Sequence, residues 1–274
     1  AQRPDHPWLE HLVLLCVPNY NADGNDRMRK DNRPGQVGPE DGMGERSNAQ
    51  GLDLNRDFMK MASPECRCLV DLINQWDPHV LIDTHTTNGS QHRYALTYDV
   101  PHNPASPASL RQFMRQEMMP EITRQLETRN IFSFYYGNFD RDYTQWITFG
   151  DEPRYSTEYI GLRGRMSILA ESYAYMGYPA RIVASREFVR ECLNCMASRA
   201  PVIRQLLGDI RQQTVAAASQ PASGSTVPIQ SEVVALDEKV VIKGFQLATD
   251  ANGRRITTQD PHDYAVDFLT LFKP

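Results

Sequence analysis

The stretch "HVLIDTHT", residues 79–86, indicates the fold class of this chain. It is a short, largely apolar run, as expected for a strand that is buried in a sheet. Asp83 and His85 stand two residues apart near its end, so both side chains lie on the same side of the strand. A strand of this kind is typical of a largely parallel sheet that helices cover on both faces.

Similar runs and helical segments alternate along the chain. Further strands are expected at 11–18 ("HLVLLCVP"), 93–100, 130–137, 144–150 and 165–175 ("RMSILAESYAY"). Helices are expected from Ser63-Pro64 to residue 77, at 107–129, and at 182–215 with an interruption near Pro201. This alternation predicts an α/β fold with a mixed, mostly parallel sheet that is flanked by helices.

The composition changes after residue 215. Residues 1–215 read as one domain, and "AAASQPASGSTVP" (216–228) reads as a linker. Alternating apolar and polar residues at 231–248 and 263–272 predict strands of a small β accessory segment, 229–274. About 45 residues are at the lower limit for independent folding, so we expect this segment to pack on the main domain.

Charge and hydropathy exclude two classes of protein. A net charge of -5 without a basic stripe argues against a nucleic-acid surface. No apolar run reaches the length of a transmembrane helix. The five cysteines are an odd number, and Cys192 and Cys195, one helical turn apart, are expected to be simple buried thiols. The cysteines leave the cellular compartment open.

Polar residues stand at the expected carboxyl ends of the strands, where open α/β sheets bind ligands. His85 and Glu171 interrupt otherwise apolar strands, and an unpaired polar group costs roughly 1–3 kcal/mol there. In "GLDLNRDF" (51–58), Asn55 and Arg56 are adjacent between Leu54 and Phe58. The placement of an amide and a guanidinium beside a core indicates that these two side chains bind a ligand.

Four motifs, in order and spacing, resemble the zinc carboxypeptidases of the carboxypeptidase A type, in their bacterial branch. The motifs are "NYNADGNDRMRKDNR", "GLDLNRDF", "DTHTTNG" and "ILAESYAY", and the likeness runs from about residue 12 to about residue 175. The resemblance implies a three-layer fold and removal of C-terminal residues from peptides by zinc-activated water. A secreted or periplasmic location would fit this branch.

The resemblance also implies roles for individual residues. His85 matches a histidine ligand of zinc, and Glu171 matches the general base. Arg29 matches the arginine that stabilises the oxyanion.

The remaining matches concern the substrate and a ligand's support. Asn55 and Arg56 match the pair that binds the substrate's terminal carboxylate, and a guanidinium suits that carboxylate because it donates two parallel hydrogen bonds. Asp53 matches the carboxylate that orients another histidine ligand. Tyr155 and Tyr159 are both candidates for the tyrosine that covers the substrate.

One motif of the family is missing: no His-x-x-Glu occurs in the chain. Catalytic zinc normally has three protein ligands. We therefore expect this chain to bind zinc weakly or not at all, to be inactive as it stands, and to derive from a longer, working enzyme.

Two other functions remain open. One is a zinc-dependent amidase or deacylase that acts on small acyl-amino acids. The other is a non-catalytic module that binds peptide C-termini through Asn55 and Arg56, which the missing motif favours. In each case the partner is a molecule with a free C-terminal carboxylate.

Overall fold

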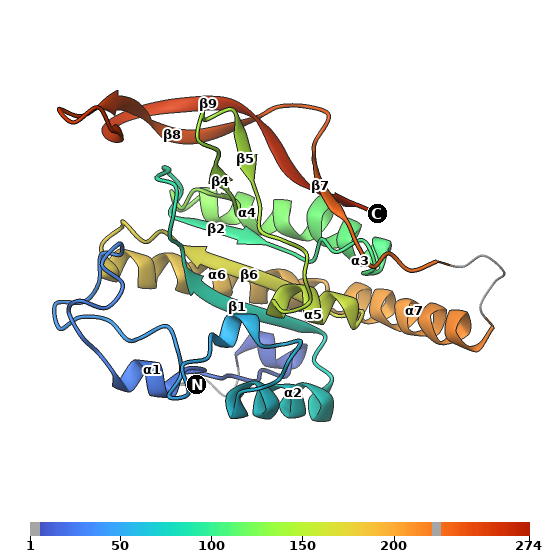
Figure 1. Cartoon of the computed structure of the whole chain (residues 1–274). Helices are drawn as coiled ribbons and strands as arrows, with labels where there is room; N and C mark the ends of the chain where they lie inside the picture. The colour runs from blue at the N-terminus through green and yellow to red at the C-terminus, as the bar shows by residue number, and fades with distance from the viewer. Residues whose placement is uncertain (1–5, 221–225) are drawn as a thin grey trace.

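The computed structural model describes residues 6–220 and 226–274, and a four-stranded sheet forms its framework (Figure 1). The strands, in spatial order, are β1 (Val80–Thr86), β6 (Met166–Ser172), β2 (Leu96–Asp99) and β3 (Ser133–Tyr135). β1 runs parallel to β6 and β2 runs parallel to β3, whereas β2 and β6 are antiparallel. The predicted mixed, mostly parallel sheet is confirmed.

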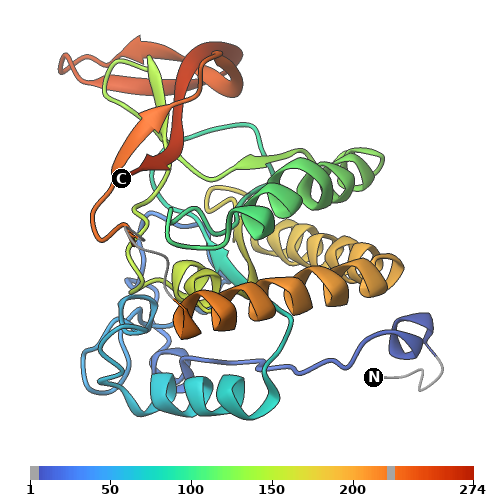
Figure 2. The same cartoon turned by 90° about the vertical axis from the view of Figure 1, so that its right-hand side faces the viewer.

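One face of this sheet packs against a layer of helices, which Figure 2 shows side by side. The layer consists of α3 (Ala108–Phe113), α4 (Met119–Glu127), α6 (Tyr178–Ser198) and α7 (Ala200–Ser219). The predicted helix at 107–129 contains a π-helical turn, Met114–Met118, just before Pro120. Proline cannot donate the backbone hydrogen bond of a regular helix, so a local change of helical pitch is expected there. The predicted interruption near Pro201 is also confirmed.

The opposite face of the sheet is covered by α5 (Ser156–Leu162), which contacts β1 and β6. Behind it lies α2 (Pro64–Trp76), whose Cys66 and Val70 pack with Phe58 and with Tyr159 of α5. Ser63 caps α2 as predicted, since its side chain accepts a hydrogen bond from the backbone of Cys66. All residues of β6 are buried, which agrees with a strand covered on both sides.

The predicted strand at 11–18 is wrong. Between the short helices η1 (Pro7–Glu10) and α1 (Ala22–Asp26) this segment is extended but unpaired, and Val13 is 80% exposed. β1 is the edge of the sheet in the described part of the chain. An apolar run becomes a buried strand only where a neighbouring strand pairs with it. Residues 11–18 pair with no strand among the described residues, and apart from Leu12, which packs against the core, they are exposed.

The predicted linker also needs correction. α7 continues through residues 216–219, because its alanines are strong helix formers. Residues 221–225 of the predicted linker lie outside the described residues.

The predicted C-terminal strands are confirmed, and they join strands of the main part of the chain. β9 (Arg255–Lys273) pairs with β8 (Val240–Thr249), with β7 (Glu232–Ala235) and, in parallel, with β5 (Gln145–Ile147). β5 in turn pairs with β4 (Asn138–Phe139). Trp146 of β5 and Phe268 of β9 are buried in one cluster, so the C-terminal strands pack against residues of the preceding part of the chain.

The state of the cysteines and the character of the long helices match the predictions made from the sequence. All five cysteines are free, and Cys192 and Cys195 are buried thiols, as predicted. Among residues 6–220 and 226–274, no helix combines the length and the apolar character needed to cross a bilayer.

Candidate functional site

His85 and Glu171 stand next to each other at the carboxyl ends of two parallel strands. They are direct partners in the register of β1 and β6. Residues that are partnered in a parallel ladder point to the same face of the sheet. This face also carries Asp83 of β1, and it is the face that α5 covers. The sequence predicted that both side chains would lie at one edge, and the structure places them there.

Two buried atoms of this pair lack hydrogen bonds. Nε2 of His85 lies 2.9 Å from Oδ1 of Asp83, at ion-pair distance but without the alignment of a hydrogen bond. Oε2 of Glu171 has no partner among the described residues. A buried polar atom without a partner is costly, and such atoms in native structures often mark a binding or catalytic site.

The environment shifts the protonation of both groups. Burial raises the pKa of Glu171 to about 7, and Asp83 adds to this, while His85 acts against it. For His85, burial opposes the charged form, but the carboxylate of Asp83 outweighs it and raises the pKa to about 9. The Asp83 pKa is lowered, because the pairing with His85 outweighs the effect of burial. A carboxyl group whose pKa is near neutrality can accept and return a proton.

The segment that contains "DLNRDF" is fixed by its own carboxylates. Asp53 precedes the short helix η2 (Leu54–Arg56) and accepts a hydrogen bond from the backbone of Asn55 at 3.0 Å. Its other oxygen binds Nε of Arg46 at 2.9 Å. Asp57 is buried and accepts hydrogen bonds from the backbone and hydroxyl of Ser63, which joins η2 to the start of α2.

Asn55 and Arg56 are half-buried at the surface of this segment. The guanidinium of Arg56 lies over the ring of Tyr155, 4.6 Å from its centroid, and NH1 donates to the carbonyl of Asn55 at 2.8 Å. The positive charge of Arg56 is one of the smaller effects that act against burial on the pKa of Glu171. The ring of Tyr155 and the carbonyl of Asn55 hold the guanidinium in one orientation.

The structure separates the two candidate tyrosines. Tyr155 contacts Arg56, as described above, and it precedes α5. Tyr159 packs on Phe58 with 5.5 Å between ring centroids, and its hydroxyl accepts a hydrogen bond from Arg163. Tyr155 is thus the one beside the candidate carboxylate-binding residue.

Arg29 is not brought to these residues. Its side chain is 69% exposed and forms two hydrogen bonds with Asp31, at 2.8 and 2.7 Å, within its own loop. The backbone of Arg29 pairs with Met43. Its assignment as the oxyanion-stabilising residue remains a prediction.

Sequence reasoning missed three residues near the pair. Arg46 acts electrostatically on both His85 and Glu171, and Tyr136 lies near Glu171, whose charge adds to the effect of burial in raising the tyrosine's pKa. Ser156 donates a hydrogen bond to Asp83 at 2.6 Å. None of the three carries a local signal, because each contact joins segments that are distant in the sequence.

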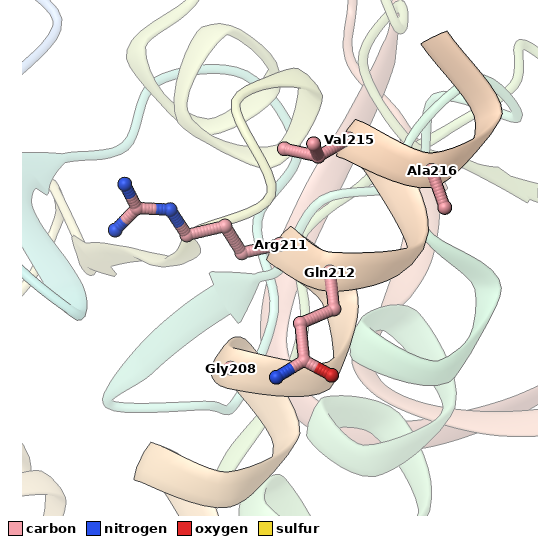
Figure 3. Close-up of a pocket in the computed structure, with 5 residues that line it drawn as sticks. All are labelled: Gly208, Arg211, Gln212, Val215 and Ala216. Atoms are coloured by element: carbon pink, nitrogen blue, oxygen red, sulfur yellow. The ribbon is translucent and has the colours of Figure 1, made fainter. Parts of the chain in front are cut away.

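The residues described do not make up a zinc site by themselves. Within residues 6–220 and 226–274, no group of three or more histidine, cysteine, aspartate or glutamate side chains is arranged to hold a metal ion. Catalytic zinc normally has three protein ligands, and the motifs predict one of them, His85. A shallow pocket on the surface of α7 shares no residue with this site, and Gly208, Arg211, Gln212, Val215 and Ala216 line it (Figure 3).

Comparison with known proteins gave matches only among solved structures. No protein-family model matches the chain. No curated protein sequence matches it either.

The structural matches include two metallo-carboxypeptidases. One is from Pseudomonas aeruginosa, solved in complex with (2-guanidinoethylmercapto)succinic acid; it is 16% identical, with 74% of this chain and 51% of that chain covered and a TM-score of 0.49. The other is from Burkholderia cenocepacia, 15% identical, with 59% and 43% covered and a TM-score of 0.42. This chain spans about half the length of the first. The chain is similar in structure to these two bacterial metallo-carboxypeptidases, at low sequence identity.

Proposed function

We propose that this chain carries the substrate-binding and proton-transfer part of a carboxypeptidase-type hydrolase that removes C-terminal residues from peptides. The observation that supports this most directly is the Glu171 carboxylate, which is buried, partnered in register with His85 and without a hydrogen bond at Oε2. The order of the four sequence motifs supports the same assignment.

In this proposal Glu171 handles the proton. Its carboxylate takes a proton from the water that attacks the scissile carbonyl, and it then gives that proton to the leaving amine. Its position at the end of a fully buried strand holds it still, and a pKa near neutrality suits both steps.

Arg56 and Asn55 bind the carboxylate of the last residue in the same proposal. Tyr155 supports this role, because its ring holds the guanidinium in place. A bidentate interaction with a carboxylate gives specificity for a chain end, since an internal residue has no such group.

Zinc is the metal expected for the complete protein, with His85 as one of its ligands. The described residues do not provide the other ligands, so no step above depends on it. Metal analysis of the full-length gene product tests this expectation separately from the roles of Glu171 and Arg56.

The test is hydrolysis by the full-length gene product of two substrates, a short peptide with a free C-terminus and an N-acyl amino acid. We expect release of the C-terminal residue from the peptide, with the N-acyl amino acid a poorer substrate. Preference for the N-acyl amino acid would indicate the deacylase. Binding of peptide C-termini without any cleavage would indicate the non-catalytic module and would contradict the proposal.

A further inference from the structure

Ser156, the first residue of α5, forms a short chain of contacts with β1. Its hydroxyl donates to Oδ2 of Asp83 at 2.6 Å, and Oδ1 of the same carboxylate lies 2.9 Å from Nε2 of His85. The two oxygens of Asp83 are therefore engaged on different sides. Ser156 is 1% exposed, so water has little access to its side chain.

The first turn of α5, which carries Ser156, is held in place through Glu158. Glu158 is fully buried, and Oε2 accepts a hydrogen bond from the backbone of Asn103 at 2.9 Å. The backbone of His102 donates to the same carboxylate. A side chain on a helix that is held in this way has little freedom to move, which is the condition for positioning a neighbouring group.

The orientation of the His85 ring depends on Asp83. The two nitrogens of an imidazole point in different directions, so a ring that turns Nε2 toward Asp83 turns Nδ1 away from it. Nε2 itself is buried without an aligned hydrogen bond among the described residues, so its 2.9 Å contact with Oδ1 of Asp83 is an ion pair. A carboxylate that was free to rotate would not keep the ring in this orientation.

We propose that Ser156 is a positioning residue for the candidate site: it fixes the Asp83 carboxylate, which in turn holds the His85 ring with Nε2 toward Asp83 and Nδ1 directed away from it. This inference rests on the proposed function for its biological meaning. It adds two residues, Ser156 and Asp83, to which the motif comparison gives no role.

The experiment follows the ring of His85 by NMR in the full chain labelled with ¹⁵N-histidine, at one fixed pH. The His85 signals are assigned by their loss in His85→Gln. In the unsubstituted protein we expect a slowly exchanging proton on Nε2, because this atom is buried and held at 2.9 Å from the fixed carboxylate of Asp83. Ser156→Ala should make this proton exchange roughly tenfold faster, the factor that corresponds to one hydrogen bond of ordinary strength.

Two further variants separate positioning from general destabilisation. Ser156→Thr keeps the hydroxyl and should restore slow exchange. Ser167→Ala is the matched control, because Ser167 is equally buried and its hydroxyl has no partner among the described residues, so His85 should not change. If Ser156→Ala does not fold, Ser156→Cys replaces it, since a thiol keeps the size but donates only weakly.

Unchanged exchange at Nε2 in Ser156→Ala, or an equal change in Ser167→Ala, would overturn the inference. The result does not depend on peptide cleavage. A protein that cleaves nothing but shows the predicted exchange would refute the proposed function and leave the positioning role supported.

Discussion

In the part of the chain that the structure describes, His85 and His102 both lie beside carboxylates, and they differ in how completely they are enclosed. His102 is 3% exposed, with Asp99 at 3.8 Å and Glu158 at 3.3 Å, and the rings of Phe149 and Phe272 pack against it. His85, in contrast, keeps 24% of its side chain exposed beside Asp83.

Hydrogen bonds join the His102 cluster to several neighbouring segments. Backbone groups of His102 and Asn103 donate to Glu158, and Thr148 donates to Asp99 at 2.7 Å. Glu171, beside His85, retains an oxygen without a partner among the described residues. The His102 cluster is not fully satisfied either, since Nδ1 of His102 is buried without a partner among the described residues. The two clusters therefore differ in exposure and in the segments that their hydrogen bonds join, and the more exposed His85 cluster is the candidate site.

The largest effect is expected when the cluster around His85 loses the carboxylate of Glu171. Glu171→Gln should lower kcat/KM for peptide hydrolysis by the full-length protein about 10²- to 10⁴-fold, because an amide cannot accept the proton from water. The fold should be retained, which circular dichroism can check. Equal activity of the variant and the unsubstituted protein would show that Glu171 is not the base.

Substitution in the enclosed cluster around His102 should lower the stability of the fold. His102→Ala leaves Asp99 and Glu158 buried without the cation between them, so the free energy of unfolding should fall by about 3–5 kcal/mol. His85→Ala should cost less, roughly 1–3 kcal/mol, because 24% of its side chain is exposed and Asp83 keeps its hydrogen bond from Ser156. Denaturant titration of both variants measures the difference, and equal losses would break the distinction between the clusters.

Loss of the Arg56 guanidinium should weaken substrate binding. Arg56→Ala should lower kcat/KM roughly 10- to 150-fold, mainly through KM, since hydrogen bonds to charged groups contribute about 1.5–3 kcal/mol. Arg163→Ala is the matched control, because Arg163 also lies over a tyrosine, Tyr159. A larger effect at Arg163 would argue against the role of Arg56.

The smallest effect concerns the pH dependence of stability. Burial raises the pKa of Glu158 to about 7 from its usual 4.5, so the unfolded chain releases this proton first and stability falls as the pH rises from about 4.5 to about 7. The raised pKa of His102, in which the carboxylates outweigh burial, acts in the same direction above pH 6.5. Glu158→Gln should reduce the slope by up to about 1.4 kcal/mol per pH unit. Unfolding curves at several pH values test this. If the slope of unfolding free energy against pH is the same in Glu158→Gln, the proton that causes it is not on Glu158.

Much of the framework could be predicted from the sequence, because the signals are local. The apolar runs at β1 and β6 and the Ser63-Pro64 start of α2 depend on residues that are close in the chain. The adjacency of His85 and Glu171 followed from a general rule, since the carboxyl ends of parallel strands meet at one edge.

The features that could not be predicted depend on distant segments. The run at 11–18 has the pattern of a strand, but no strand in the described part of the chain pairs with it. The contact of Ser156 with Asp83 spans 73 residues, and nothing in either segment indicates it. Arg29 has the motif of a catalytic arginine, but in the structure it is paired with Asp31.

The most direct measurement compares two peptides that differ only at the C-terminus, one with a free carboxylate and one with an amide, as substrates of the full-length protein. The proposed function predicts cleavage of the free peptide and at least roughly tenfold lower kcat/KM for the amide, a difference that Arg56→Ala should abolish. Equal cleavage of both peptides, or cleavage of neither by the metal-loaded protein, would contradict it.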